Sequence, residues 1–300
     1  MARAALTPNL EGAAWMLGSA VCFTAMTTLI KYLGADYPAT LQTFYRQAAG
    51  LVILAPLIAR NWRRAFDTTR PGILLFRSAA GVVGTILSFY AYQKMPLVDA
   101  NALSFTRALW LTPLAFFMLG ERLGPARIGA SVAGFVGVLV MLAPTGHETL
   151  GWPQVAALTS AFLFALTVTG MKVMTRDHSP FTILVYAAVL GAAFSLPPAL
   201  FVWRWPHPVD LVLLSLMGVL GVGTQACYIK GMQIGDAAAM APIDYTRLVF
   251  AVGLGLLLFH EVPRTRTIVG AAIVVGATLY ITLREHRQTR RAEKLAAVDT

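Results

Sequence analysis

Ten apolar runs, separated by short segments rich in charge, proline or glycine, make up most of this chain. A helix needs roughly 20 apolar residues to cross the hydrocarbon core of a bilayer. Backbone polar groups cannot stay unpaired in lipid, and the runs are too long for barrel strands, so the pattern predicts an all-α bundle of ten transmembrane helices. The predicted spans cover residues 12–32, 40–59, 73–92, 98–119, 127–143, 153–171, 180–201, 209–229, 237–259 and 266–283.

Composition supports a lipid environment. Hydrophobic residues make up 57% of the chain and charged residues 13%, whereas about a quarter of a soluble domain is charged. The net charge of +10 does not indicate a nucleic-acid partner, because the positive residues gather in loops and in the tail between apolar runs. Cys22 and Cys227 both fall inside apolar runs, which favours two small buried side chains over a disulfide or a metal site.

The distribution of lysine and arginine predicts the orientation. With the N-terminus inside, the inner segments hold 15 of these residues and the outer segments hold 5. This bias predicts that both termini, the short polar segment 1–11 and the basic tail 284–300, are cytoplasmic. The first apolar run is too long for a signal-peptide core and is expected to be retained as a span.

A short motif occurs twice, at a constant offset of 140 residues. The matching pairs are Phe105 and Tyr245, Thr106 and Thr246, Arg107 and Arg247, and Glu121 and Glu261. We infer two homologous halves, 12–143 and 152–283, joined by a linker at 144–151. Because each half has five spans, the second half is predicted to enter the membrane from the opposite face. Inverted repeats of this kind are typical of secondary transporters, which bind substrate near the midplane at the repeat interface.

The candidate chemistry lies at mid-membrane depth. Arg107 is about 14 Å from one end of its span and about 21 Å from the other, and Arg247 reaches a similar depth. Charges at this depth predict a lined cavity or pathway. Asp244 lies three residues before Arg247 and is expected to pair with either Arg247 or Arg107. One arginine is then left over, and it suits the carboxylate of an amino acid or another organic anion.

Aromatic and polar residues surround these arginines in the sequence. The predicted substrate-binding residues, besides the two arginines and Asp244, are Asn101, Phe105, Thr106, Trp110, Tyr245, Thr246, Tyr90, Tyr92 and Tyr228, with Gln225 nearby. The alternative for the last three tyrosines is an interfacial aromatic belt. Pro113 and Pro242 are candidate bending points for gating, or static kinks.

Other charged residues and the small residues are predicted to lie outside the substrate site. Arg46 is expected to line an outer vestibule or to snorkel, and Arg77 to snorkel to the inner interface. Glu121 and Glu261 are predicted to anchor helix ends and not to carry protons. The fifth and tenth runs carry stripes of small residues and are predicted to pack against other helices or against a second copy. The stripes contain Ala130, Gly134 and Gly137, and Gly270, Ala271 and Gly276.

The chain resembles the drug/metabolite transporter superfamily in its EamA branch, and within it the YddG-type bacterial amino-acid exporters. The resemblance rests on the segments Arg107–Arg122 and Arg247–Val262, each followed by a Gly/Ala-rich run, and on an echo of Lys94–Ala100 in Lys230–Ala237. It implies a bacterial plasma-membrane transporter whose cavity is formed by spans other than the fifth and tenth. Substrates of this family range from amino acids through S-adenosylmethionine to drugs.

The expected function is therefore secondary transport by alternating access, with export of amino acids, mainly aromatic and other neutral ones. The alternatives are export of a drug or another metabolite such as S-adenosylmethionine, or, in another class, a channel or structural membrane protein. No catalytic residue, metal site or cofactor is expected, because no ligand cluster or nucleophile motif lies at depth. The expected partners are a small-molecule substrate and the lipid bilayer. The sequence leaves open whether the chain is a monomer or a homodimer, and whether transport is coupled to protons.

Overall fold

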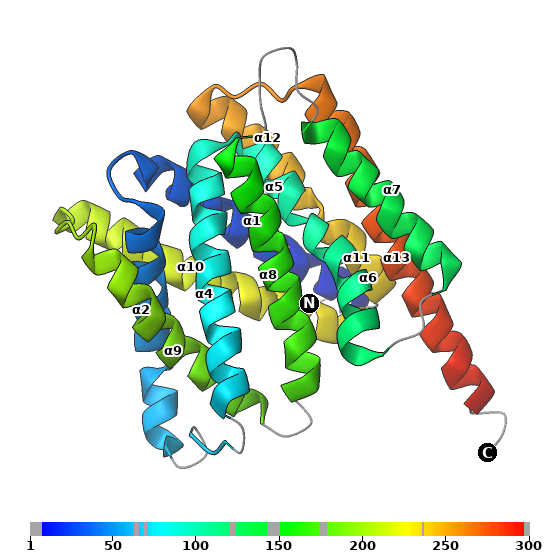
Figure 1. Cartoon of the computed structure of the whole chain (residues 1–300), viewed down its shortest axis with the longest axis horizontal. Coiled ribbons are helices and arrows are strands. Elements are labelled where there is room, and N and C mark those ends of the chain that lie inside the picture. Colours follow the sequence, from blue (N-terminus) through cyan, green and yellow to red (C-terminus); the bar gives the residue numbers. More distant parts are fainter. Residues whose placement is uncertain are drawn as a thin grey trace, which may run out of the picture.

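The computed structural model describes residues 8–62, 66–68, 71–120, 124–142, 151–174, 179–235 and 237–296, and every regular element within these ranges is a helix (Figure 1). The first half contains α1 (Pro8–Tyr32), the short 3-10 helix η1 (Leu33–Ala35), α2 (Ala39–Arg60), α4 (Pro71–Lys94), α5 (Leu97–Ser104), α6 (Thr106–Leu119) and α7 (Pro125–Leu142). The second half contains α8 (Trp152–Met174), α9 (Pro180–Leu200), α10 (Pro208–Ile234), α11 (Ala237–Asp244), α12 (Thr246–Phe259) and α13 (Thr265–Ala296).

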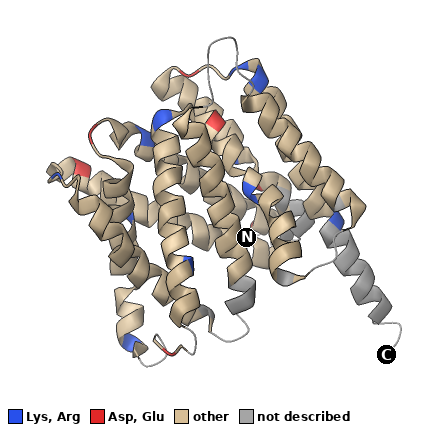
Figure 2. Ribbon diagram, in the orientation of Figure 1, with Lys and Arg blue, Asp and Glu red and all other residues tan. Residues whose placement is uncertain are grey.

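Seven helical segments of the described residues are long and apolar enough to cross a membrane. They are Leu10–Ala35, Pro71–Lys94, Trp152–Gly170, Phe181–Leu200, Pro208–Ile234, Pro242–Phe259 and Thr265–Arg284. Charged residues lie mostly toward helix ends, with few along the middle of the bundle (Figure 2). The prediction of an all-helical membrane protein is confirmed. The finer count of ten spans goes beyond these seven, partly because the predicted span 98–119 is divided into two shorter helices.

Two predicted spans are broken at equivalent positions, at Phe105 between α5 and α6 and at Tyr245 between α11 and α12. In each case the next residue is a threonine whose hydroxyl donates to a carbonyl three residues earlier, at 2.6 Å from Thr106 to Leu103 and at 2.7 Å from Thr246 to Ile243. Such a bond gives the backbone an alternative to the helical ladder.

The two prolines proposed as bending points lie inside helices, Pro113 within α6 and Pro242 within α11, and not at the positions where the spans divide. Their part in gating stays a prediction. At the C-terminus the apolar stretch that could cross a membrane is Thr265–Arg284, close to the predicted span 266–283, and α13 continues beyond it to Ala296. The added segment is rich in arginine, glutamate, lysine and alanine, which are strong helix formers.

The helices of the two halves pack against each other throughout the bundle. The main pairs are α1 with α10, α4 with α8, α2 with α9, α2 with α10, α4 with α9, and α7 with α13. The last pair lies along one side of the molecule (Figure 1). A Cβ atom on Gly270 would lie 2.6 Å from the carbonyl oxygen of Gly137. Gly137 and Gly270 thus let the two backbones meet at this crossing, so these two glycines serve packing within the chain.

Candidate functional site

A cavity of about 480 Å³ lies inside the bundle. Its described lining comes from α1, α2, α4, α5, α6, α8, α9, α10 and α12, together with Phe105 at the first break. The lining residues include none from α7 or α13 among those described, as expected for spans that only pack. The volume falls in the range of small-molecule sites.

Four arginines from four different helices line this cavity: Arg46 of α2, Arg77 of α4, Arg107 of α6 and Arg247 of α12. No aspartate or glutamate is among the described lining residues. Arginine stays protonated in proteins, and a cation held away from bulk water needs a compensating group. The cavity is therefore a site of strong positive potential inside an apolar bundle.

Arg247 is buried at 8% exposure and has a fixed set of partners. Its Nη2 forms an ion pair with the Asp244 carboxylate, and its Nε donates to the Asp244 carbonyl oxygen at 3.1 Å. The guanidinium also lies over two aromatic rings, 4.6 Å from the centroid of Phe23 and 5.4 Å from that of Phe105. Of the two pairings left open by the sequence, the structure has Asp244 with Arg247.

Arg107 is the cation that this pairing leaves over. It begins the first turn of α6, lines the cavity and keeps an exposed side chain. Within the described residues, neither ion pair of the structure involves Arg107. Its guanidinium donors are thus available to a ligand.

Of the other predicted site residues, Phe105 and Tyr92 line the cavity. The ring of Phe105 contacts that of Tyr245, with centroids 4.7 Å apart, and Tyr245 is outside the lining. The hydroxyl of Tyr245 bonds that of Thr278 on α13. Tyr92 is almost fully buried, and its hydroxyl lies 3.5 Å from the Asn101 side-chain oxygen.

The remaining predicted residues lie beside the cavity and not in its lining: Asn101, Thr106, Trp110, Thr246, Asp244, Tyr90 and Tyr228. Their polar groups are largely used locally. The fully buried Asn101 donates to the Leu97 carbonyl at 2.8 Å, and the two threonines bond carbonyls of their own helix breaks. Trp110 packs edge-on against Phe135 and Phe162. Polar residue type and depth alone did not separate groups that face the cavity from groups that hold helices in place.

A compact polar cluster lies at one end of the bundle. The Lys31 ammonium forms an ion pair with Glu261 and donates to the Met95 carbonyl at 2.6 Å. The second Glu261 oxygen accepts from the Leu97 amide at 2.8 Å, at the start of α5. Glu261 thus anchors helix ends, as predicted, whereas Glu121 lies outside the described residues.

The adjacent loop between α1 and α2 is held at the same end. Tyr37 is buried there and donates to the Asp210 carboxylate at 2.8 Å. Burial, with a smaller effect of the Asp210 hydrogen bond, raises the pKa of Tyr37, so the hydroxyl stays a donor.

Comparison with known proteins identifies the family. Residues 10–143 and 151–283 each match the EamA-like transporter family, so two copies cover nearly the whole chain. The chain belongs to the EamA-like transporter family. It is accordingly a multi-pass membrane transporter and not an enzyme.

Relatives of this EamA-like transporter are named for different substrates. It is 31% identical over 284 residues to the S-adenosylmethionine uptake transporter of Rickettsia prowazekii, covering 94% of this chain and 96% of that one. It is 29% identical to the riboflavin transporter of Vibrio cholerae, covering 96% and 98%. A solved crystal structure superposes with a TM-score of 0.59 at 19% identity, covering 93% and 97%, and shares the fold. These relatives do not support the expected likeness to amino-acid exporters.

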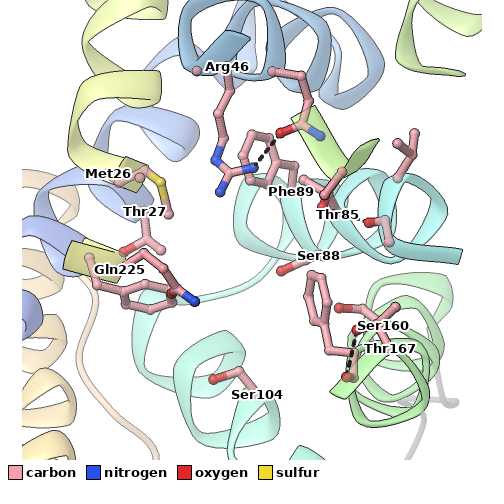
Figure 3. Close-up of a pocket in the computed structure, with 18 of the residues that line it drawn as sticks. Met26, Thr27, Arg46, Thr85, Ser88, Phe89, Ser104, Ser160, Thr167 and Gln225 are labelled. Atoms are coloured by element: carbon pink, nitrogen blue, oxygen red, sulfur yellow. Dashed lines mark hydrogen bonds between the residues drawn. The ribbon is translucent and has the colours of Figure 1, made fainter. Parts of the chain in front are cut away.

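Several lining residues of the transporter were missed or misplaced by sequence reasoning. Arg77 was expected to snorkel to the inner interface but lines the cavity, and Arg46, expected to line an outer vestibule or to snorkel, lines the cavity too. A row of hydroxyls was also overlooked, and Figure 3 shows its members around the cavity: Thr27, Thr85, Ser88, Ser104, Ser160 and Thr167. A usable signal was present on α4, where Ser78, Thr85, Ser88 and Tyr92 recur at helical spacing on one face.

Proposed function

We propose that this protein is a secondary transporter that moves small organic anions across the bacterial plasma membrane by alternating access. The observation that carries the proposal is the lining of the cavity, with four arginines and no described carboxylate. An anionic substrate would supply the missing countercharge, and bidentate hydrogen bonding to arginine suits carboxylates and phosphates.

The architecture that we propose has ten spans in two inverted five-helix repeats, with both termini in the cytoplasm. The helix pairing supports it, because the main pairs between the halves map onto one another when the halves are exchanged. Under this exchange the pair α1–α10 corresponds to α8–α4, and α2–α10 corresponds to α9–α4. The pairs α2–α9 and α7–α13 each correspond to themselves. A cavity at the interface of such repeats is the usual place for substrate in secondary transporters.

In the proposed mechanism, Arg107 binds the anionic group while Arg247 stays held by Asp244 and adds to the positive field. Phe105 and Tyr92 supply aromatic surface beside the arginines. The Lys31–Glu261 cluster closes the periplasmic end in this conformation. Release of that cluster would let the halves rock around the site and open the periplasmic end.

A second candidate substrate is S-adenosylmethionine, favoured by the relative that is 31% identical. Its carboxylate fits an arginine, but its ammonium and sulfonium charges meet no described carboxylate in the lining. Zwitterionic amino acids, the expectation from sequence, share the problem of an ammonium among arginines. The charge of the cavity therefore ranks organic anions first.

The test is counterflow in liposomes that hold the purified protein. Vesicles are preloaded with one compound at a time and given its labelled form outside, without an ion gradient. The panel contains succinate, succinamate, 3-phosphoglycerate, phenylalanine, S-adenosylmethionine and riboflavin. Accumulation of label with an anion, lost in Arg107→Gln protein of equal abundance, is the expected result. Accumulation only with S-adenosylmethionine or phenylalanine would reject organic anions as the substrate class.

A further inference from the structure

Arg46 lines the cavity with its own set of neighbours, separate from those of Arg107 and Arg247. It lies on α2, and its Nη1 donates to the Gln47 side-chain oxygen at 3.1 Å. Its guanidinium carbon is 5.9 Å from the ring centroid of Phe89. Figure 3 shows the guanidinium extending into the cavity, between Thr27 on one side and Phe89 on the other.

The Arg46 guanidinium lacks a countercharge. Its Nε atom is buried and has no hydrogen-bond partner among the described residues, and neither ion pair of the described structure involves it. Because arginine cannot give up its proton, an unpaired buried guanidinium is costly unless something binds it. Aromatic contact with Phe89 offsets only part of that cost.

The space beside this guanidinium is kept open by a glycine. A Cβ atom on Gly221 of α10 would lie 3.1 Å from Nε and 3.2 Å from Nη2 of Arg46. Gln225, one turn further along α10, and Thr85 and Ser88 of α4 also line the cavity. Neutral donors beside an unpaired guanidinium, next to a position without a side chain, form a receptor for a second anionic group.

The two positive regions are neighbours along α4. The Phe89 ring lies beside the Arg46 guanidinium, and Tyr92 lines the cavity together with Arg107 and Arg247. Phe89 and Tyr92 are three residues apart, which corresponds to a rise of about 4.5 Å along the helix. A short molecule with an anionic group at each end therefore matches the arrangement.

We infer that the substrate is a small organic dianion, a dicarboxylate or a phosphorylated carboxylate, with one anionic group at Arg107 and the other at Arg46. This inference rests on the proposed function, and it adds the second charge and the residue that recognises it. Charge balance supports it. With Asp244 opposing one of the four arginines, a monoanion leaves the described cavity more positive than a dianion does.

Binding to the purified full-length protein tests the inference. Succinate and succinamate have the same chain length, but succinamate replaces one carboxylate by a neutral amide. The affinity of wild type for succinate should exceed that for succinamate by about tenfold or more, which is the contribution of one charge-assisted hydrogen bond. Arg46→Gln should reduce this ratio to about threefold or less, and Arg46→Lys should restore part of it. Arg107→Gln should weaken binding of both compounds.

Further variants and probes separate the outcomes. Gly221→Ala crowds the Arg46 guanidinium without removing its charge, so it should also lower the ratio of succinate to succinamate affinity. This variant tests the inference even if Arg46→Gln does not fold. A parallel titration with 3-phosphoglycerate distinguishes a phosphate from a second carboxylate as the preferred group. An equal affinity of wild type for succinate and succinamate, or a ratio unmoved by both Arg46→Gln and Gly221→Ala, overturns the inference but leaves monoanion transport intact. Absence of any anion binding to wild type overturns the proposed function as well.

Discussion

The aromatic rings of Phe105 and Tyr245 contact each other at a tilt of 47°, with centroids 4.7 Å apart, although 140 positions separate the residues in the chain. They hold equivalent places in the two copies of the motif, and each stands at the break of its own span. The two breaks therefore meet at the centre of the bundle, beside Arg247. Any rocking of one half against the other would turn about this contact.

The first prediction concerns the Phe105 ring. Phe105→Leu keeps an apolar side chain but removes the ring contact with Tyr245 and the contact with the Arg247 guanidinium. We expect a loss of about 1–2 kcal/mol in stability and a several-fold weaker substrate affinity, because Arg247 is held less firmly. Thermal unfolding in detergent and counterflow titration measure the two effects. Tyr245→Phe is the matched control, since it keeps the ring and loses only the hydroxyl bond to Thr278. Unchanged affinity in Phe105→Leu would contradict the role of the ring.

The second prediction concerns the ion pair of Asp244 and Arg247. Asp244→Asn leaves a buried guanidinium with a weaker partner, so the free energy of unfolding should fall by about 2–3 kcal/mol. The same change makes the cavity more positive, so an anionic substrate should raise the melting temperature more in the variant than in wild type. Asp36→Asn makes the same chemical change in an exposed loop and should do neither. A variant that loses all anion binding while folded would instead place Asp244 in direct substrate contact.

The chain could be predicted to be a helical membrane protein because the length of its apolar runs matches the thickness of the bilayer's hydrocarbon core. The expectation that Arg107 and Arg247 line one cavity followed from counting along the same runs, which put both at a similar depth. The roles of Arg46 and Arg77 could not be predicted, because whether an arginine snorkels or lines a cavity depends on the rotation of its helix. The breaks at Phe105 and Tyr245 were also hidden, since neither residue is a proline or glycine and the threonine bonds that accompany them depend on local geometry.

The third prediction concerns the crossing of α7 and α13. A Cβ on Gly270 would lie 2.3 Å from Met141 Cγ and 2.6 Å from a backbone oxygen of Gly137, whereas one on Gly276 would meet nothing within 4 Å. Gly270→Ala should therefore destabilise the protein by about 1–3 kcal/mol, because the Gly137 carbonyl oxygen can move only if the backbone of α7 shifts. Gly276→Ala, on the same helix, should leave stability unchanged or slightly improved. Thermal unfolding of the two variants checks this, and equal melting temperatures would show that the crossing is not tight.

The fourth prediction concerns the Lys31–Glu261 cluster as the closure of one end of the cavity. Lys31→Met removes the ion pair and the bond to the Met95 carbonyl, while Glu261 keeps its bond to the Leu97 amide. Because both side chains are largely shielded, at 13% and 17% exposure, a double-mutant cycle with Glu261→Gln should give a coupling of about 1–2 kcal/mol.

If the cluster is a gate, its loss should change access to the cavity as well as stability. Labelling of a cavity cysteine from the periplasmic side therefore distinguishes a gate from a cluster that only holds helix ends. Ser104 lines the cavity, so a Ser104→Cys reporter can be placed there after Cys22 and Cys227 are replaced by alanine. In intact cells an impermeant thiol reagent should label this cysteine slowly in the parent and several-fold faster once Lys31→Met is added, because the ion pair no longer favours the closed end. Lys94→Met, which neutralises an exposed lysine near the same helix ends, should leave the rate unchanged. If Lys31→Met lowers the melting temperature but not the protection of the cysteine, the cluster holds helices together without acting as a gate, and closure must lie with Phe105, Tyr92 and their neighbours deeper in the bundle.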